Sequence, residues 1–171
     1  VYRDIDSDFD GKADQYRWLS TAGTRWGLDK DQDGQIDRWK MISAQEVTAE
    51  MVAAVRDRDL PRFKLLLLTS QELTELGMGK EQADEIKDQL SSAAQGFTRF
   101  CQQQKTVKSS TKWVNFGGTQ PGVVPTGTDG ATKDVFVYDN VAAIVENGTQ
   151  HEQFILGTLV TAAGAWPVLC E

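Results

Sequence analysis

An acidic pattern of nine residues occurs twice near the start of this chain, and it restricts how the first forty residues can fold. The pattern is D-x-D-x-D-G-x-x-D, at positions 6–14 and again at 29–37, a period of 23 residues. The match continues outside the acidic residues, because Ile5 aligns with Leu28 and Tyr16 aligns with Trp39. Apolar or aromatic residues therefore flank each copy, which predicts a repeated unit of short strand, acidic loop and short strand.

Each acidic loop carries the ligand types that a hard divalent cation prefers. Carboxylates at the first, third and fifth positions of a tight loop converge, and glycine at the sixth permits a sharp bend. The carbonyl of the seventh residue and the carboxylate of the ninth can complete the set. Oxygen ligands suit Ca²⁺ better than Zn²⁺ or Cu²⁺, and Mg²⁺ prefers more water. We therefore predict two Ca²⁺ sites. The predicted ligands are Asp6, Asp8, Asp10, Lys12 and Asp14 in the first loop, and Asp29, Asp31, Asp33, Gln35 and Asp37 in the second.

The loops are similar to the first half of an EF-hand loop, and more closely resemble the calcium loops of dockerin and thrombospondin type 3 repeats. They depart from the EF-hand at position 12, where Arg17 and Lys40 replace the bidentate Glu. The residues around these positions, 16–19 and 38–42, predict strands rather than exiting helices. A calcium sensor is therefore not expected, and binding should weaken toward about 10⁻⁴–10⁻³ M, as in extracellular modules.

Two alternatives to metal binding remain open for this segment. Asp-Gly pairs also mark hairpin turns. However, a cluster of carboxylates repels itself by on the order of several kcal/mol when partly desolvated, and a cation relieves that repulsion. Exposed aromatic side chains such as Trp18, Trp26 and Trp39 could instead bind carbohydrate, although packing in a small core also explains them.

Helical periodicity replaces the strand pattern after residue 43. Ser43 and Glu46 form a capping-box signature, which predicts a helix over 44–58. A second helix is expected to start at 59–61, and a third begins at the capping box of Thr69 and ends at Gly77. Helical spacing then continues for about 20 residues beyond Gly79.

Strand-like segments follow residue 104. The expected strands cover 112–116, 135–138, 141–145, 153–161 and 166–169, separated by turn signals at Asp139-Asn140, Asn147-Gly148 and Ala163-Gly164. Residues 117–133 form a loop rich in Gly, Pro and Thr. Helices followed by an antiparallel meander indicate the α+β class, with one sheet face covered by helices. The predicted organisation is a calcium-binding repeat module over 1–43 and an α+β domain over 44–171.

The second part resembles the nuclear-transport-factor-2-like, or cystatin-like, cone fold. The resemblance rests on residues 141–146 (VAAIVE) and 158–169 (TLVTAAGAWPVL), which read as an apolar strand, a glycine turn, a Trp and an apolar strand. It implies helices packed on a curved antiparallel sheet. Some cone folds hold a ligand pocket or an acid–base pair between sheet and helices.

The whole chain is similar to the N-terminal, non-thioredoxin region of planctomycete-type bacterial envelope proteins that carry a thioredoxin or redoxin domain farther along. Residues 1–19 (VYRDIDSDFDGKADQYRWL) and the second acidic loop carry this resemblance. It implies an extracytoplasmic accessory region. Redox activity is not expected here, because the chain contains no C-x-x-C motif.

The remaining sequence features exclude several classes of function. The net charge of −7 argues against nucleic acid and anionic membrane surfaces as partners. No apolar stretch reaches the length of a membrane span. The sequence from Val1 onward shows no leader pattern of basic, apolar and then small residues, so we expect a mature or excised fragment. Two cysteines far apart, Cys101 and Cys170, exclude a disulfide scaffold but allow one bridge outside the cytosol.

A catalytic constellation is not apparent. Asp139 and Glu146 are expected at a turn and on a solvent-facing strand position, and His151 is expected in an exposed loop. The resulting prediction is a non-catalytic, calcium-binding extracytoplasmic module, periplasmic, secreted or on the cell surface, that serves a larger envelope protein by contacting an unknown protein or downstream domain. The rival interpretation is a cone-fold domain that binds a small ligand or catalyses a reaction, with calcium in a structural role.

Overall fold

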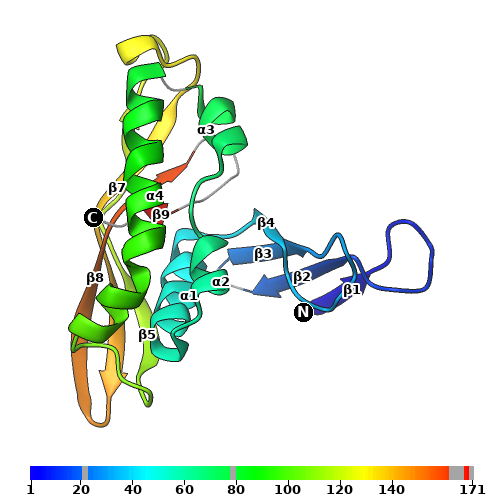
Figure 1. Cartoon of the computed structure of the whole chain (residues 1–171), viewed down its shortest axis with the longest axis vertical. Coiled ribbons are helices and arrows are strands. Elements are labelled where there is room, and N and C mark those ends of the chain that lie inside the picture. The colour runs from blue at the N-terminus through cyan, green and yellow to red at the C-terminus, as the bar shows by residue number, and fades with distance from the viewer. Residues whose placement is uncertain (21–22, 78–79, 162–167, 170–171) are drawn as a thin grey trace.

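The chain forms two antiparallel sheets with four helices between them in sequence (Figure 1). The computed structural model describes residues 1–20, 23–77, 80–161 and 168–169. Helices and strands each account for about a third of the chain, 33% and 34%. The α+β class predicted from the sequence is therefore confirmed.

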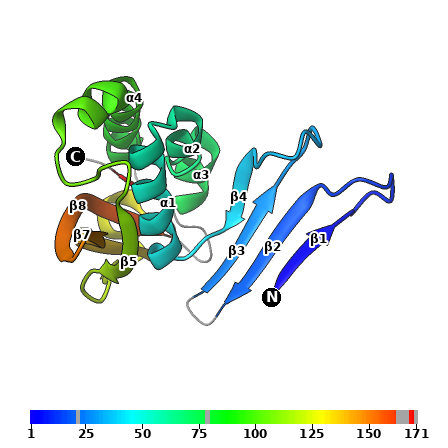
Figure 2. The same ribbon diagram turned by 90° about the horizontal axis from the view of Figure 1, so that it is seen from below.

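The first sheet is a four-stranded meander in the order β1-β2-β3-β4. Both acidic loops lie at the same end of this sheet, because one joins β1 to β2 and the other joins β3 to β4. Figures 1 and 2 show that this end points away from the helices. The four strands are β1 (Tyr2–Ile5), β2 (Gln15–Ser20), β3 (Gly23–Leu28) and β4 (Arg38–Met41).

Four helices follow the first sheet, and each starts near its predicted signal. Ser43 and Thr69 form the two capping boxes, and Asp59 caps the short helix in which Pro61 occupies the first turn. A glycine with φ of 69°, Gly77, ends the third helix. The helices are α1 (Ala44–Asp57), α2 (Leu60–Lys64), α3 (Ser70–Leu76) and α4 (Lys80–Gln103).

The second sheet has the order β5-β7-β8-β9, with the short strand β6 paired to β7. Its long hairpin, β7 and β8, turns at Asn147–Gln150, as the Asn-Gly pair predicted. The strands are β5 (Lys112–Gly117), β6 (Gly122–Val124), β7 (Val135–Asn147), β8 (Gln150–Thr161) and β9 (Val168–Leu169). A 3₁₀ turn covers Thr128–Gly130.

Two predictions about this sheet were wrong. Asp139-Asn140 does not end a strand, because β7 is continuous and Asn140, with φ of 54°, lies at an irregularity between Tyr138 and Val141. Pairing on both sides of the irregularity holds the strand together. The loop expected over 117–133 contains β6 and a 3₁₀ turn, since β7 offers β6 a partner that local composition does not reveal.

Near the C-terminus, the described residues test only part of the last predicted strand. Strand β9 coincides with the last two residues of the strand expected over 166–169. The turn expected at Ala163-Gly164 and the residue Cys170 lie outside the described residues. Cys101 is buried in α4, with only 6% of its surface exposed.

The main core lies between the helices and one face of the second sheet. Side chains of strand β8 point alternately into this core and away from it. Phe154 and Leu156 are each 4% exposed, while Ile155 between them is 61% exposed. The rings of Phe63 in α2 and Phe97 in α4 stack with their centroids 4.4 Å apart. The buried faces of α1, α2 and α4 thus cover the sheet as the order of elements predicted.

Charged contacts join the first sheet to the helices. Glu50 of α1 is 5% exposed and binds two arginines, Arg25 of β3 through one carboxylate oxygen and Arg62 of α2 through the other, at 2.7 Å. Trp39 of β4 packs against the main core. These contacts hold the first sheet against one side of the helical layer, and the acidic loops lie at the end of the sheet that points away from the helices (Figure 2).

Candidate functional site

The two acidic loops have the same backbone conformation, which the strands on either side enforce. The amide of the ninth loop residue closes each loop on the strand before it, Asp14 N to Ile5 O at 3.0 Å and Asp37 N to Leu28 O at 2.8 Å. Both strand pairs begin directly beside these bonds. Each loop is therefore a strand-flanked bend with a fixed span.

Two positions in each loop have positive φ. The sixth residues, Gly11 and Gly34, have φ of 90° and 85°, which glycine adopts without steric cost. The fourth residues, Phe9 and Gln32, have φ of 63° and 59°. The glycines are the positions that the sequence pattern predicted. The fourth position was missed, because the left-handed conformation there leaves no consistent residue type in the sequence.

The first aspartate of each loop organises the bend. Asp6 accepts hydrogen bonds from the amides of Phe9 at 2.7 Å and Gly11 at 2.9 Å. Asp29 accepts from the amides of Asp33 at 3.2 Å and Gly34 at 2.9 Å. The carboxylates are thus fixed inside the bend, and the amide of Gly11 holds the pKa of Asp6 below its usual value.

The ninth aspartate of each loop reaches back to the second residue. Asp14 accepts a hydrogen bond from the amide of Ser7 at 3.2 Å and another from its hydroxyl. Asp37 accepts from the amide of Lys30 at 2.7 Å. These hydrogen bonds therefore tie the second residue of each loop to the ninth, at the base of the bend.

Each loop brings three carboxylates together. Ligand oxygens of Asp6, Asp8 and Asp10 lie within 4.8 Å of one another, and so do those of Asp29, Asp31 and Asp37. These are two clusters that could hold a metal ion. Asp14 and Asp33 lie in the same loops but outside these triplets.

The other predicted ligands are placed by backbone contacts. Asp33 accepts hydrogen bonds from the amide and the side chain of Gln35, at 2.8 and 2.9 Å. Asp10 accepts a hydrogen bond from the amide of Lys12 at 2.9 Å. The amides of Lys12 and Gln35 are therefore hydrogen-bonded to the aspartates two positions before them. Ligation through the carbonyls of Lys12 and Gln35 stays a prediction.

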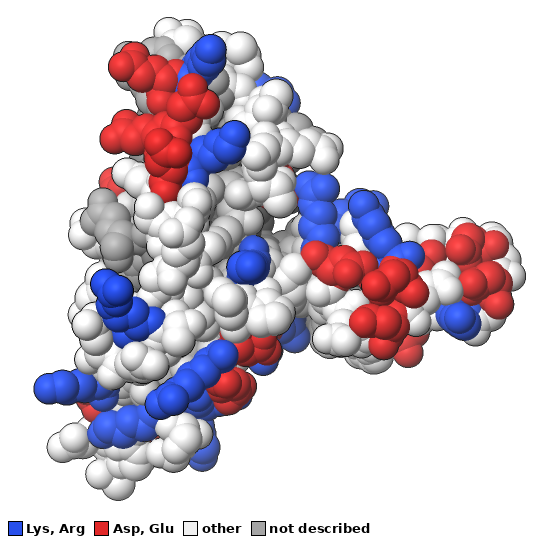
Figure 3. All heavy atoms as spheres, viewed as in Figure 1, with Lys and Arg blue, Asp and Glu red and all other residues white. Residues whose placement is uncertain are grey.

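The carboxylates within each cluster repel one another, which costs free energy when no cation is bound. The carboxylate of Asp33, followed by partial loss of hydration and Asp37, raises the pKa of Asp31 above its usual value. Loss of hydration, with a contribution from Asp10, raises the pKa of Asp8. Figure 3 shows the acidic side chains gathered on the arm formed by the first sheet. A cation bound among such carboxylates would relieve their mutual repulsion.

The two loops differ in burial. Asp29 is 0% exposed, whereas its counterpart Asp6 is half-buried. The hydroxyl of Tyr16 donates to Asp29 at 3.3 Å, and burial together with this bond raises the pKa of Tyr16. The second loop is thus built into the sheet, while the first is a more open bend.

The loops also contact each other. The amide of Asp29 donates to the carbonyl of Asp14 at 2.9 Å. The side chain of Gln32 reaches Asp8 at 3.5 Å. The end of the first loop is therefore hydrogen-bonded to the start of the second, which the sequence repeat did not reveal.

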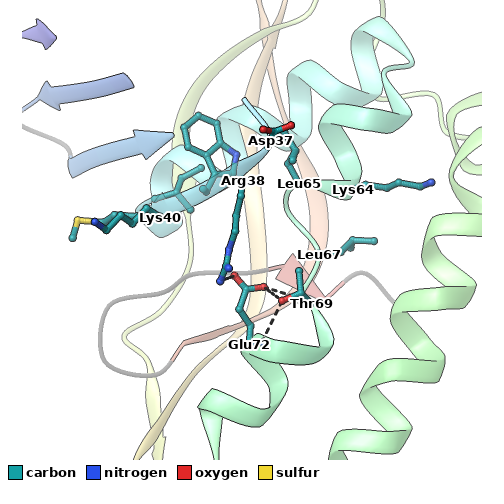
Figure 4. Close-up of a pocket in the computed structure, with 11 residues that line it drawn as sticks. Asp37, Arg38, Lys40, Lys64, Leu65, Leu67, Thr69 and Glu72 are labelled. Carbon is teal, nitrogen blue, oxygen red and sulfur yellow. Dashed lines mark hydrogen bonds and ion pairs between the residues drawn. The ribbon is translucent and has the colours of Figure 1, made fainter. Parts of the chain in front are cut away.

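The second loop continues directly into the helical layer. Arg38 follows Asp37, and its guanidinium binds Glu72 of α3 at 3.1 Å. Glu72 also accepts hydrogen bonds from the amide and the hydroxyl of Thr69, both at 2.8 Å, and so caps α3 (Figure 4). In this view the Asp37 carboxylate lies apart from the ion pair, and it accepts its hydrogen bond from the amide of Lys30 in the loop.

The aromatic residues of the first sheet do not form a flat platform. The rings of Tyr2 and Trp18 are tilted by 44°, and those of Trp18 and Trp39 by 60°. Trp26 lies beside the cations of Arg17 and Lys40, at 4.8 and 3.8 Å from its ring centre. A row of coplanar indoles, as a flat sugar-binding surface would need, is not present among these residues.

The acidic residues and the histidine of the second sheet are exposed or half-buried. His151 lies opposite Glu146 across the β7–β8 hairpin, with Nε2 3.8 Å from Oε2, and the His151 side chain is 59% exposed. Asp139 is exposed and accepts from Thr158 at 3.5 Å. The structure therefore brings Glu146 and His151 together on the surface of a strand pair, with Asp139 elsewhere on β7.

Comparison of the chain with protein-family models, with curated proteins and with solved structures found no match. Among the described helices, none is both long enough and apolar enough to cross a membrane.

Proposed function

We propose that this chain is a calcium-binding, non-catalytic module that binds one Ca²⁺ in each acidic loop. One observation carries the proposal: two loops of the same conformation each hold three carboxylates within 4.8 Å. The oxygen-only donor set favours Ca²⁺ among the common divalent ions. At a free concentration ~100 times the dissociation constant, each ion would add about 2.7 kcal/mol to the free energy of unfolding.

We further propose an extracytoplasmic location and an accessory role in a larger bacterial envelope protein. Because both loops lack the bidentate Glu, we expect dissociation constants of about 10⁻⁴–10⁻³ M, as in extracellular modules, so that the loops fill only where calcium is in the millimolar range. The resemblance of residues 1–19 and of the second loop to the N-terminal regions of redoxin-bearing envelope proteins supports the same location. A thioredoxin-like domain is one neighbour that this resemblance suggests.

Calorimetric titration with Ca²⁺ and thermal melts with and without chelator test the metal proposal. Two binding events and a higher melting temperature with calcium are expected. Asp8→Ala and Asp31→Ala should each remove one event, because each deletes one carboxylate of one triplet. Asp88→Ala, an exposed position on α4, is the matched control and should keep both. Absence of heat and of any melting shift would overturn the proposal, as would full stoichiometry in both loop variants.

A second candidate function has one observation in its favour. A pocket of about 140 Å³ opens between α1, α2, α4 and β8, lined only by apolar residues. The lining residues are Met51, Phe63, Ala93, Gly96, Phe97, Phe100, Ile155 and Leu156. This pocket suits a small apolar ligand, such as some proteins of the cone fold hold between sheet and helices. It offers no acid–base pair, so it supports binding rather than catalysis. Titration with a naphthalene-based fluorescent probe tests it, and Gly96→Leu should abolish the signal by filling the pocket.

A further inference from the structure

A groove of about 450 Å³ lies between the first sheet and the start of the helical layer. It is formed by β1, β2 and β3 on one side and by α1 and β5 on the other. Its position is at the opposite end of the strands from the acidic loops, because Tyr2, Trp18 and Arg25 pair beside the β2–β3 turn. Crevices between packed units, of this size, are the usual place for ligands.

Three aromatic rings line this groove from separate elements. Tyr2 of β1 is 52% exposed, and Trp18 of β2 and Trp113 of β5 are half-buried. Trp113 is held in place, because its indole N–H donates to Thr48 of α1 at 3.0 Å. The rings of Tyr2 and Trp18 lie 5.2 Å apart. The groove therefore has fixed aromatic surfaces on both walls.

The polar groups of the groove come from α1 and β3. Gln45 is half-buried and lines the groove with its side-chain amide, which can both donate and accept. Glu46 lies 3.8 Å from the guanidinium of Arg25, while its other oxygen accepts from the Ser43 hydroxyl at 2.7 Å. Capping and ion pairing thus hold donors and acceptors in fixed positions.

This combination selects a class of ligand. A charged ligand gains little, because Arg25 is already paired with Glu50 and with Glu46. A purely apolar ligand would desolvate the Gln45 amide and the Glu46 carboxylate without replacing their hydrogen bonds. A pyranose sugar has an apolar C–H face that stacks on aromatic rings and an edge of hydroxyls that both donate and accept. We propose that this groove binds a neutral sugar between Tyr2 and Trp113, with hydrogen bonds to Gln45 and Glu46.

Two-dimensional ¹H–¹⁵N spectroscopy of the intact chain tests the proposal, with cellotriose, maltotriose and tri-N-acetylchitotriose as separate probes. At millimolar sugar, at least one probe should shift the indole signals of Trp18 and Trp113 in a saturable way and leave that of Trp26, on β3, unchanged. Trp113→Phe assigns its signal. The titrations are run in calcium and in chelator, so that this result does not depend on metal binding by the loops.

Matched variants separate stacking from general effects. Tyr2→Ala and Gln45→Ala should each weaken sugar binding, the first by about tenfold through loss of a stacked ring. Phe136→Ala removes another aromatic residue, 36% exposed on β7 and outside the groove, and should bind as the wild type does. The absence of a saturable indole shift with all three sugars overturns the proposal. Unchanged affinity in both groove variants, or binding of the naphthalene probe to this groove in place of sugar, overturns it as well.

Discussion

Arg38 and Glu72 form an ion pair of 3.1 Å that joins the strand leaving the second acidic loop to the N-terminus of α3. Because Arg38 follows Asp37 in sequence, one residue separates a predicted metal ligand from the helical layer. Glu72 is shared, since it also completes the capping box of Thr69. The loop and the helix cap therefore depend on the same carboxylate.

This shared carboxylate predicts an order of stabilities. Glu72→Ala should lower the free energy of unfolding by about 1–2 kcal/mol, because it removes both the ion pair and half of the capping box. Arg38→Ala should cost less, about 0.5–1 kcal/mol, since the cap remains. Urea denaturation measures both, and the double variant should show a coupling between the two residues. Equal costs for the two single variants would contradict the shared role.

Asp29 should matter more than Asp6 even without metal. Asp29→Asn is expected to lower the free energy of unfolding in chelator by about 1–3 kcal/mol, because its amide cannot accept all the hydrogen bonds that the buried carboxylate accepts. Asp6→Asn should cost less, since water reaches the half-buried Asp6 and replaces lost bonds. Thermal melts in chelator compare the two variants. A larger effect at Asp6 would show that burial does not set the difference.

Glu50 should be a key residue of the junction between the first sheet and the helices. Glu50→Ala leaves Arg25 and Arg62 without their shared partner, and we expect a loss of about 2 kcal/mol. The loss is below that of a fully buried pair, since the two arginine side chains are 27% and 36% exposed. Lys112→Ala, which breaks an exposed pair with Glu146 on the second sheet, is the control and should cost less than about 0.5 kcal/mol.

The loop before β7 should be sensitive to acid. The amide and hydroxyl of Thr126 both donate to Asp134 at 2.8 Å, and they hold the pKa of Asp134 below its value of 3.8 in the unfolded chain. A depressed pKa stabilises the fold above the unfolded value, and this stabilisation is lost as the pH falls through the folded value. Asp134→Asn should therefore be less stable than the wild type at neutral pH and equally stable well below the folded pKa. Denaturation at both pH values measures the difference, and a gap that persists in acid would contradict this origin.

Much of the acidic segment was predictable because its information is local. The spacing of Asp6, Asp8 and Asp10 around Gly11 places carboxylates on one bend whatever the rest of the chain does. The flanking aromatic and apolar residues predicted the four short strands. The positive φ of Phe9 was not predictable, since left-handed backbone at a non-glycine residue depends on the hydrogen bonds that the bend makes.

The helical segment was predictable for a similar reason, and the second sheet less so. Capping boxes at Ser43 and Thr69 act within one turn, so the sequence alone marked the starts of α1 and α3. Pairing partners in a sheet are distant in sequence. Strand β7 continues through Asn140 because it pairs with β8 on both sides of that residue, and β6 forms because it pairs with β7. No local sequence pattern predicts either feature.

The sequence by itself determined the two bends, the carboxylates gathered on them and the order of helices and strands, because hydrogen-bond geometry and periodicity operate over a few residues. Only the tertiary structure decided that Asp29 is buried while Asp6 is open, that Arg38 meets Glu72, and that Tyr2, Trp18 and Trp113 surround one groove. These relationships join residues that can be more than a hundred positions apart, as Tyr2 and Trp113 are, and they arise from the packing of two sheets and a helical layer rather than from any local preference.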